Sequence, residues 1–264
     1  MNEPASIRFE DGAAYEENMG KWSRVAGETF LDWLAPPKGL RWIDVGCGNG
    51  AFTELLVERT APAAIEGIDP SEAQLAFART RHKAGIARFR AGDATALPFP
   101  DDSFDAAVMA LVLFFVPDPV KGVAEMIRVV RPGGIVAVYL WDLPAGGIPH
   151  APVGAELRAM GLNPALPPSF QISTMEALRA LWQDSKFEEI DEREIVVTRE
   201  FADFDALWKT FMLAPTLAPV VSGMTSADVE ALKTRVRARF PTDQAGRVTC
   251  RGMANAIKGR VPAK

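Results

Sequence analysis

Three glycines, Gly46, Gly48 and Gly50, occupy alternate positions directly after a short apolar segment at residues 42–45. Glycine allows a tight turn and leaves no Cβ between the backbone and a bound molecule. A helix that begins at such a turn directs its free N–H groups towards that molecule. The spacing is G-x-G-x-G and not the G-x-G-x-x-G of dinucleotide-binding loops, although Ala51 satisfies the second pattern loosely. We therefore predict a cofactor-binding loop, and the spacing alone does not exclude a nicotinamide cofactor.

Two aspartates follow the next two apolar segments of the chain. Asp69 ends residues 64–69, and Asp93 comes soon after residues 86–90. A carboxylate at Asp69 can accept two hydrogen bonds from a ribose diol, or Asp69 only precedes the helix that Ser71 caps. Asp93 either binds the exocyclic amine of adenine or simply turns the chain. Three loops at one sheet edge are more specific than any one of them, so together they indicate an adenosine-containing ligand.

Strand and helix patterns alternate over the first part of the chain, and these elements must position the three loops. Short apolar segments predict strands at residues 42–45, 64–69, 86–90, 104–111 and 135–141. Amphipathic segments predict helices at residues 22–34, 51–60, 71–83 and 117–131. Such alternation produces a parallel sheet with helices on both faces, whose ligands lie beyond the carboxyl ends of the strands. The expected fold class is α/β: a doubly wound, Rossmann-like, mostly parallel seven-stranded sheet with a helical cap over the strand carboxyl ends.

The pattern changes after Trp141, where proline and glycine become frequent. Further strands are predicted at residues 187–197 and 248–257, and further helices near 155–160, 173–185, 203–213 and 226–240. No linker-like stretch precedes this part, so we expect one domain over residues 1–264. Its expected parts are N-terminal lid helices at 1–35, a cofactor-binding core at 36–142, pocket-walling insertions at 143–185 and 203–240, and the last strands at 186–202 and 247–258.

Composition excludes several classes of function. The 264 residues include 29 Lys and Arg against 34 Asp and Glu, and 48% are hydrophobic, as in an ordinary globular protein. The longest apolar run, residues 106–116, is much shorter than the roughly 20 residues of a membrane span. The N-terminus lacks the basic and apolar stretches of a signal peptide, so we expect a cytoplasmic protein. Two distant cysteines, Cys47 and Cys250, cannot build a cysteine-rich zinc site, and we expect no metal.

The charges are unevenly distributed along the chain. Residues 1–69 carry twelve acids and six bases, a net −6, whereas residues 233–264 carry nine bases and one acid, a net +8. A basic end of this kind can bind nucleic acid. However, Arg235, Arg237 and Arg239 are spaced by two, so on a helix they spread around the axis and form no single stripe. We therefore expect a solvated flank, a small-molecule substrate and no nucleic-acid partner.

Taken together, the motifs resemble those of the class I S-adenosylmethionine-dependent methyltransferases, and most closely the ubiquinone/menaquinone methyltransferase-like branch. The resembling segments are WIDVGCGNG (42–50), GIDPS (67–71), AGDATALPFPDDSFDAAV (91–108), FFVPDP (114–119) and RVVRPGGIVAV (128–138). They cover about residues 40–142. Residues 14–24, AYEENMGKWSR, are similar to the N-terminal cap of a bacterial subgroup, whose C-terminal helical region resembles residues 203–211.

The resemblance implies a methyltransferase that uses S-adenosyl-L-methionine and releases S-adenosyl-L-homocysteine. It implies that the three glycines hold the methionine part of the cofactor and that Asp44 anchors the glycine loop or the ammonium group. Asp69 would bind the ribose hydroxyls, and Asp93 with Ala94 would hold the adenine. Arg24, in the lid, would pair with the methionine carboxylate. The implied cofactor-binding residues are Tyr15, Arg24, Asp44, Gly46, Gly48, Gly50, Asp69, Pro70, Ser71, Asp93, Ala94 and Leu111.

A sulfonium methyl is already activated, so catalysis needs mainly an acceptor held in line and protected from water, which is worth up to ~7–11 kcal/mol. Related sequences commonly carry a small polar residue or a histidine near the end of the fourth strand, but residues 109–115 are wholly apolar here. The Asn/Asp-Pro-Pro-Tyr/Phe motif typical of enzymes that methylate bases is also absent. A small, apolar or aromatic acceptor is therefore expected. Its predicted pocket is Phe114, Phe115, Trp141, Trp208 and Phe211, although core packing explains the last two equally well.

No catalytic residue is assigned, because a base is needed only where the acceptor must lose a proton. The candidates are His150, for which a solvated loop is the favoured alternative, and Asp142, which could equally cap a turn. Two other functions compete with methyl transfer: non-catalytic binding of the cofactor or its product, and nucleotide-dependent oxidation–reduction. The chain lacks a Tyr-x-x-x-Lys or comparable hydride-site pair, which disfavours the second.

Overall fold

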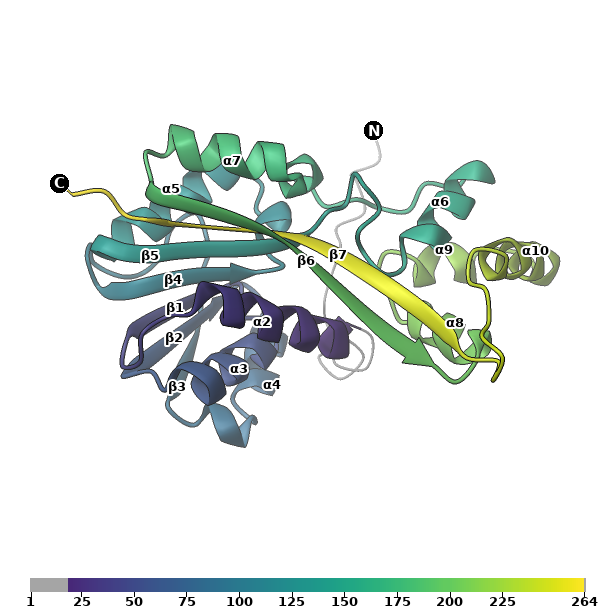
Figure 1. Cartoon of the computed structure of the whole chain (residues 1–264), viewed down its shortest axis with the longest axis horizontal. Coiled ribbons are helices and arrows are strands. Elements are labelled where there is room, and N and C mark those ends of the chain that lie inside the picture. The colour runs from purple at the N-terminus through teal and green to yellow at the C-terminus, as the bar shows by residue number, and fades with distance from the viewer. Residues whose placement is uncertain (1–18, 264) are drawn as a thin grey trace.

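Seven strands form one twisted sheet in the computed structural model, which describes residues 19–263 (Figure 1). The strands are β1 (Arg41–Val45), β2 (Ala64–Asp69), β3 (Ala87–Ala91), β4 (Phe104–Ala110), β5 (Val130–Trp141), β6 (Glu188–Phe201) and β7 (Val248–Arg260). Their order across the sheet is β3-β2-β1-β4-β5-β7-β6. The first five pair in parallel, whereas β7 is antiparallel to both β5 and β6. The predicted fold class is confirmed.

The carboxyl ends of the central strands meet at one edge of the sheet. Asp44 of β1 lies opposite Gly67 of β2 and Val108 of β4 in the strand register. β4 is buried along almost its whole length, because helices cover both faces of the sheet. The chain leaves all three strands at this edge, and the loops after β1, β2 and β4 therefore come together there.

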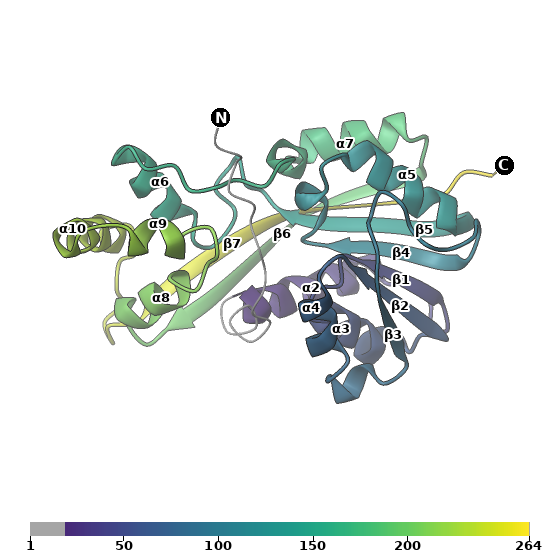
Figure 2. The same ribbon diagram turned by 180° about the vertical axis from the view of Figure 1, so that it is seen from behind.

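Helices cover both faces of this sheet and one of its ends. They are α2 (Lys21–Leu34), α3 (Ala51–Thr60), α4 (Glu72–Ala78), α5 (Pro119–Val129), α6 (Ala151–Ala159), α7 (Met175–Asp184), α8 (Phe204–Phe211), α9 (Ala218–Ser222) and α10 (Ser226–Arg237). Figures 1 and 2 show α2, α3 and α4 on one face and α5 and α7 on the other. Side-chain caps explain several helix starts. Asp118, for example, accepts a hydrogen bond from Lys121 N at 3.0 Å.

Several elements differ from the prediction, and α6, for example, begins at Ala151 and not near residue 155. The helix expected at residues 71–83 ends at Ala78, and a short 3₁₀ turn, η2 (His82–Ala84), follows it. β5 begins at Val130, five residues before the predicted start, and its pairing with β4 is irregular between Val130 and Ile135, where Gly133 has a φ of 73°. The short helix α9 was not predicted, since its five residues are too few for a periodic pattern.

β6 and β7 continue beyond the sheet as a two-stranded ribbon. β7 pairs with β6 from Val248 to Arg260, but with β5 only through residues 254–260, so residues 248–253 have β6 as their only neighbouring strand among the described residues. Figure 1 shows α6, α8, α9 and α10 gathered around the far end of this ribbon, past the carboxyl ends of β4 and β5. Most of the two predicted insertions therefore forms the expected helical cap, while α7 covers the sheet itself.

The N-terminal helix α2 is part of the hydrophobic core. Trp22 and Phe30 are fully buried, and the Phe30 ring centroid lies 4.7 Å from that of Tyr139 in β5. The Tyr139 hydroxyl donates to Ser23 O at 3.5 Å. The described part of the predicted lid, residues 19–35, is therefore packed against the sheet. No helix within residues 19–263 is long and apolar enough to cross a membrane.

Candidate active site

The loop between β1 and α3 holds its glycines in the left-handed backbone region, with φ of 77° at Gly46, 52° at Gly48 and 78° at Gly50. Its first two N–H groups donate to Ile68 O at 2.7 and 2.9 Å, which ties the loop to the end of β2. A Cβ on Gly46 would lie 2.4 Å from the Val112 side chain, in the loop after β4. Glycine is therefore required where the β1 and β4 loops meet.

Asp69, at the end of β2, reaches across to the glycine loop. Its Oδ2 accepts a hydrogen bond from Gly48 N at 2.9 Å, and its Oδ1 accepts one from Ser71 N at 2.8 Å. Burial raises the pKa of the Asp69 carboxyl, and the two N–H groups oppose that rise. The carboxylate therefore fixes the glycine loop relative to the start of α4.

Asp44, at the end of β1, is almost completely buried. Its Oδ2 accepts a hydrogen bond from Thr53 Oγ1 at 2.6 Å. Its Oδ1 has no hydrogen-bond partner among the described residues. Burial raises the pKa of Asp44 to about 7, against the effect of Thr53. A buried carboxylate oxygen without a partner is unfavourable unless a ligand supplies a donor, so this atom suits an ammonium group.

The loop after β3 is turned by Asp93, whose Oδ1 accepts hydrogen bonds from Thr95 N at 2.7 Å and Thr95 Oγ1 at 2.8 Å. These two bonds lower the pKa of the Asp93 carboxyl. Asp93 is exposed and Ala94 is half-buried. Chain turning, one of the two roles considered for Asp93, is thus what the described contacts support.

Arg24 points away from the glycine loop. It donates to Glu58 Oε2 at 2.9 Å, near the end of α3, and its Nε lies 3.2 Å from Glu28 Oε1. The glycine loop lies at the opposite end of α3, so the predicted pairing of Arg24 with a cofactor carboxylate is not what the structure has. Tyr15, the other predicted lid residue, lies outside the described residues.

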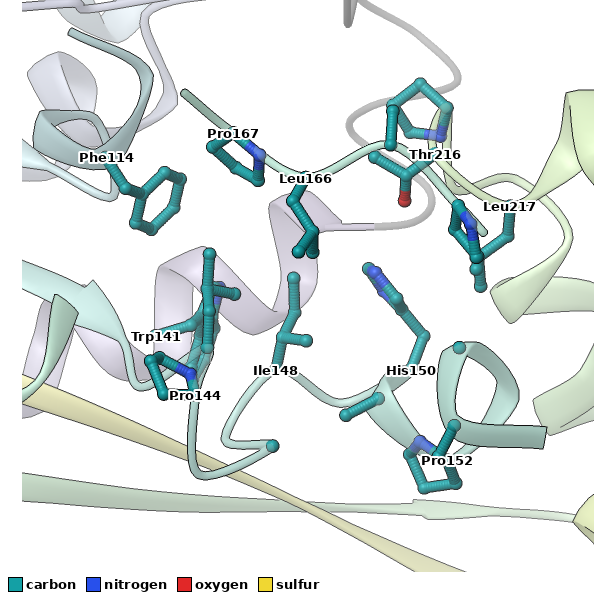
Figure 3. A pocket seen from close by; sticks show the side chains of 18 of the residues that line it. Phe114, Trp141, Pro144, Ile148, His150, Pro152, Leu166, Pro167, Thr216 and Leu217 are labelled. Carbon is teal, nitrogen blue, oxygen red and sulfur yellow. The ribbon is translucent and has the colours of Figure 1, made fainter. Parts of the chain in front are cut away.

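A cavity of about 370 Å³ opens beyond the carboxyl ends of β4 and β5 (Figure 3). This volume is near the lower end of the range of about 300–1,000 Å³ for small-molecule sites. Leu111, which has a φ of 62°, lines the cavity and directly precedes Val112, the residue packed against Gly46. The cavity and the glycine loop are therefore adjacent. The lining residues are Met19, Leu111, Phe114, Phe115, Trp141, Leu143, Pro144, Gly146, Ile148, His150, Ala151, Pro152, Gly154, Ala155, Arg158, Pro164, Ala165, Leu166, Pro167, Pro215, Thr216, Leu217 and Arg239.

Two sequence similarities show the family to which this chain belongs. Residues 43–138 match the family described as methyltransferase domain. A demethylmenaquinone methyltransferase of Renibacterium salmoninarum is 35% identical over 174 residues, which are 62% of this chain and 67% of that protein. The chain is a class I S-adenosylmethionine-dependent methyltransferase. It belongs to the ubiquinone/menaquinone methyltransferase-like branch of that family.

Further relatives of this methyltransferase agree in sequence or in fold. The ubiquinone/menaquinone biosynthesis C-methyltransferase of Paracoccus denitrificans is 36% identical over 119 residues, which are 44% of this chain and 48% of that protein. The methyltransferase thus spans about half the length of this relative. Among solved structures, YcgJ of Bacillus subtilis has a TM-score of 0.59 and 17% identity, and the match covers 91% of this chain and 100% of that one. The Haemonchus contortus phosphoethanolamine N-methyltransferase 2 has a TM-score of 0.59 and 16% identity, over 98% of this chain and 59% of that one.

The cofactor of the methyltransferase is S-adenosyl-L-methionine, and the residues at this sheet edge fit its chemistry. The unpartnered Oδ1 of Asp44 can accept a hydrogen bond from an ammonium group. A Cβ on Gly48 would come no closer than 4.0 Å to another side chain, so this face of the loop is open to a ligand. Family membership also overturns the nucleotide-dependent oxidoreductase that the glycine spacing left open.

Three of the five residues predicted for the acceptor pocket line the cavity of the methyltransferase: Phe114, Phe115 and Trp141. Trp208 and Phe211 do not, and for them the alternative of core packing is correct. Trp208 packs on Phe204 of its own helix, and the Phe211 ring centroid lies 5.8 Å from that of Phe240. The apolar face of α8 therefore turns towards β6 and the end of α10. Sequence reasoning missed the segments 164–167 and 215–217, whose proline content was the available signal of irregular walls.

His150 lines the cavity, so the favoured prediction of a solvated loop is wrong. Figure 3 shows its ring entering from the start of α6 towards Leu166 and Thr216. Burial lowers the pKa of His150 to about 4, which leaves the ring neutral near pH 7. Asp142 instead caps a turn: its Oδ1 accepts from Ala145 N at 3.1 Å and its Oδ2 accepts from Asn255 Nδ2 at 2.8 Å.

The lowered pKa of His150 predicts a pH-dependent stability. Between pH 6.5 and 4 the unfolded chain protonates this histidine while the folded protein does not, so the free energy of unfolding decreases as the pH falls. At about 1.4 kcal/mol per unit of pKa shift, the loss between pH 7 and pH 4 is about 3 kcal/mol. Urea unfolding of the wild type and of His150→Gln from pH 7 to pH 4 measures it. We expect the wild-type curve to fall more steeply below pH 6.5 and the two curves to run parallel above pH 7. Parallel curves over the whole range would contradict the prediction.

Proposed function

We propose that this methyltransferase transfers the methyl group of S-adenosyl-L-methionine to a small, apolar or aromatic molecule held in the cavity beyond β4 and β5. One observation carries the proposal: the cavity meets the cofactor loop, because Leu111 lines it and the next residue, Val112, packs against Gly46. Aromatic rings of Phe114 and Trp141 form the wall nearest to the strands. Such rings suit an aromatic acceptor, and their electron-rich faces also attract a sulfonium cation.

Different residues at the strand ends would bind different parts of the cofactor. In this proposal the glycine loop holds the methionine part, and Asp44 Oδ1 accepts a hydrogen bond from its ammonium group. Asp69 binds the ribose hydroxyls. The adenine lies along the β3 loop, for which the proposed contacts are Pro70, Ser71, Asp93, Ala94 and Leu111.

When bound, the cofactor supplies an activated methyl group. The protein positions the acceptor and excludes water from the cavity. The glycine loop would hold the cofactor and the cavity residues would hold the acceptor, so that the reacting atom of the acceptor would lie in line with the methyl group. Holding the acceptor in line is worth up to ~7–11 kcal/mol. No Asp or Glu lies among the described lining residues, so the cavity offers no carboxylate base. An acceptor that is already electron-rich or ionised fits this lining best.

The names of the curated relatives support an aromatic acceptor. The relative from Renibacterium salmoninarum is named for demethylmenaquinone, and the one from Paracoccus denitrificans for ubiquinone and menaquinone biosynthesis. Both names refer to quinones. The ring of a quinone is a small, flat group of the kind that a pocket lined by aromatic side chains can hold. The proposal for this chain is limited to a ring-bearing small molecule.

Release of S-adenosylhomocysteine in the presence of a panel of hydroxylated mono- and bicyclic aromatics tests the proposal. We expect at least one of these compounds to stimulate release, and Ala155→Phe, which fills the cavity, to lower the stimulated rate at least tenfold. Ala180→Phe, on the exposed side of α7, is the matched control and should keep the rate. Both variants should bind the cofactor as the wild type does. Full activity of Ala155→Phe, or stimulation by aliphatic amines alone, would contradict an aromatic acceptor in this cavity.

A further inference from the structure

The cavity has two chemically different ends. Figure 3 shows Phe114 and Trp141 at the end nearest to the strands, and His150 and Thr216 at the other end. Ile148 lies between these two groups. A molecule that fills the cavity therefore meets rings at one end and hydrogen-bonding groups at the other.

The charged side chains of the described lining are two arginines, Arg158 and Arg239. Arg239 is neutralised by Glu156, whose Oε1 accepts hydrogen bonds from Arg239 Nε at 2.8 Å and Nη2 at 2.5 Å. Within residues 19–263, by contrast, no carboxylate forms an ion pair with Arg158. The lining therefore carries one uncompensated positive charge.

The guanidinium of Arg158 is directed along α6 towards the end that holds His150. A Cβ built on Gly154 would lie 3.4 Å from Arg158 Nη1, which shows that the side chain folds back over the preceding helical turn. This distance is an ordinary van der Waals contact, so the guanidinium rests against the turn of α6 that holds Gly154. Arg158 thus lies on the same helix as His150, with its charge moved towards the start of that helix.

We infer that the acceptor carries a carboxylate group, which Arg158 binds at the α6 end of the cavity while the apolar body of the acceptor lies between Phe114 and Trp141. This inference rests on the proposed function, because it assigns a polar end to the same acceptor. A guanidinium presents paired N–H donors that match the two oxygens of a carboxylate. The neutral His150 ring and the Thr216 hydroxyl supply further donors nearby. An acceptor with an ammonium group would meet a like charge at this end and should bind more weakly than a neutral one.

A matched set of three ligands tests this inference on the full chain saturated with S-adenosylhomocysteine. The set is 6-hydroxy-2-naphthoic acid, its methyl ester and 6-(aminomethyl)-2-naphthol, which share one ring system and differ in charge. Calorimetry should show the acid binding at least tenfold more tightly than the ester, and the ester more tightly than the amine. Arg158→Gln should reduce the preference for the acid to less than threefold, and Arg158→Glu should reverse it in favour of the amine. Because Arg158 is exposed, the preference should also weaken as salt is added.

Arg235→Gln is the matched control, because Arg235 is an exposed arginine on α10 outside the cavity lining. It should keep the full preference for the acid. Equal binding of acid and ester by the wild type would overturn the inference and leave the proposed function intact. Loss of the preference in Arg235→Gln as well would also overturn it. Binding of S-adenosylhomocysteine without binding of any of the three naphthols would contradict the aromatic acceptor site itself, and the inference with it.

Discussion

Gly46→Ala is expected to lower the free energy of unfolding by about 2–5 kcal/mol and to remove most of the affinity for S-adenosyl-L-methionine. Two separate terms make up this loss. A residue with a Cβ at a φ of 77° costs roughly 1–2 kcal/mol. The new Cβ would also lie 2.4 Å from Val112 Cγ1 and 2.6 Å from Cγ2, and such overpacking costs roughly 1–3 kcal/mol. Relief of the clash would move the loop that binds the cofactor. Urea unfolding and calorimetry with the cofactor measure the two effects.

Gly39→Ala is the matched control for the backbone term. Gly39 has a φ of 78°, and a Cβ there would have nothing within 4 Å, so this variant should lose only about 1–2 kcal/mol. The double variant Gly46→Ala/Val112→Ala should bind the cofactor better than Gly46→Ala alone, because it removes the atoms that clash. Equal losses in Gly46→Ala and Gly39→Ala would show that the close approach of the β1 and β4 loops is not significant for stability.

The cofactor edge of the sheet could be predicted from the sequence because local rules determine it. Each apolar segment of the first half became a strand, and parallel strands joined by helices must end at one edge. This places Asp44 and Asp69 beside the three glycines without any knowledge of distant contacts. The hydrogen bond between Asp69 and Gly48 N could not be predicted from the sequence, because this bond depends on the register of β1 against β2.

The acceptor end could be predicted only in part, because its walls come from segments far apart in the chain. Phe114 follows β4 closely and Trp141 ends β5, so their place was determined by the sheet. The amphipathic spacing of Trp208 and Phe211 shows that one face of α8 is covered, but spacing does not tell which element covers it. His150 lies in a segment rich in proline and glycine, where no periodic pattern distinguishes a solvated loop from a cavity wall.

Several bases of the C-terminal end form ion pairs with acids of other elements. Lys258 and Arg260 of β7 form ion pairs with Asp191 and Glu189, two acids of the adjacent strand β6. Arg237 pairs with Asp205 at the start of α8. Exposed pairs of this kind contribute about 0–1 kcal/mol each. The uneven charge along the sequence is thus largely balanced in space, which agrees with the predicted solvated flank.

Asp69→Ala is expected to weaken the binding of S-adenosyl-L-methionine by about 10–150-fold, since hydrogen bonds to a charged acceptor are worth roughly 1.5–3 kcal/mol. The carboxylate holds Gly48 N and Ser71 N, and in the proposed function it also binds the ribose. Asp105→Ala is the matched control. Asp105 likewise accepts two hydrogen bonds, from Arg131 Nε at 2.6 Å and Arg41 N at 2.8 Å, but it lies at the opposite edge of the sheet. Calorimetry should show unchanged affinity in this control.

A second measurement separates direct binding of the ribose from support of the glycine loop. S-adenosylhomocysteine and its 2′-deoxy analogue differ only in one of the two ribose hydroxyls that Asp69 is proposed to bind. In the wild type the analogue should bind at least tenfold more weakly, whereas in Asp69→Ala the two ligands should differ less than threefold, because the partner of the hydroxyl is gone. The same ratio in both proteins would mean that Asp69 acts only through the loop. The ribose would then have to be bound by another group at the carboxyl end of β2, and the affinity lost in Asp69→Ala would measure how much the ordered loop contributes to binding.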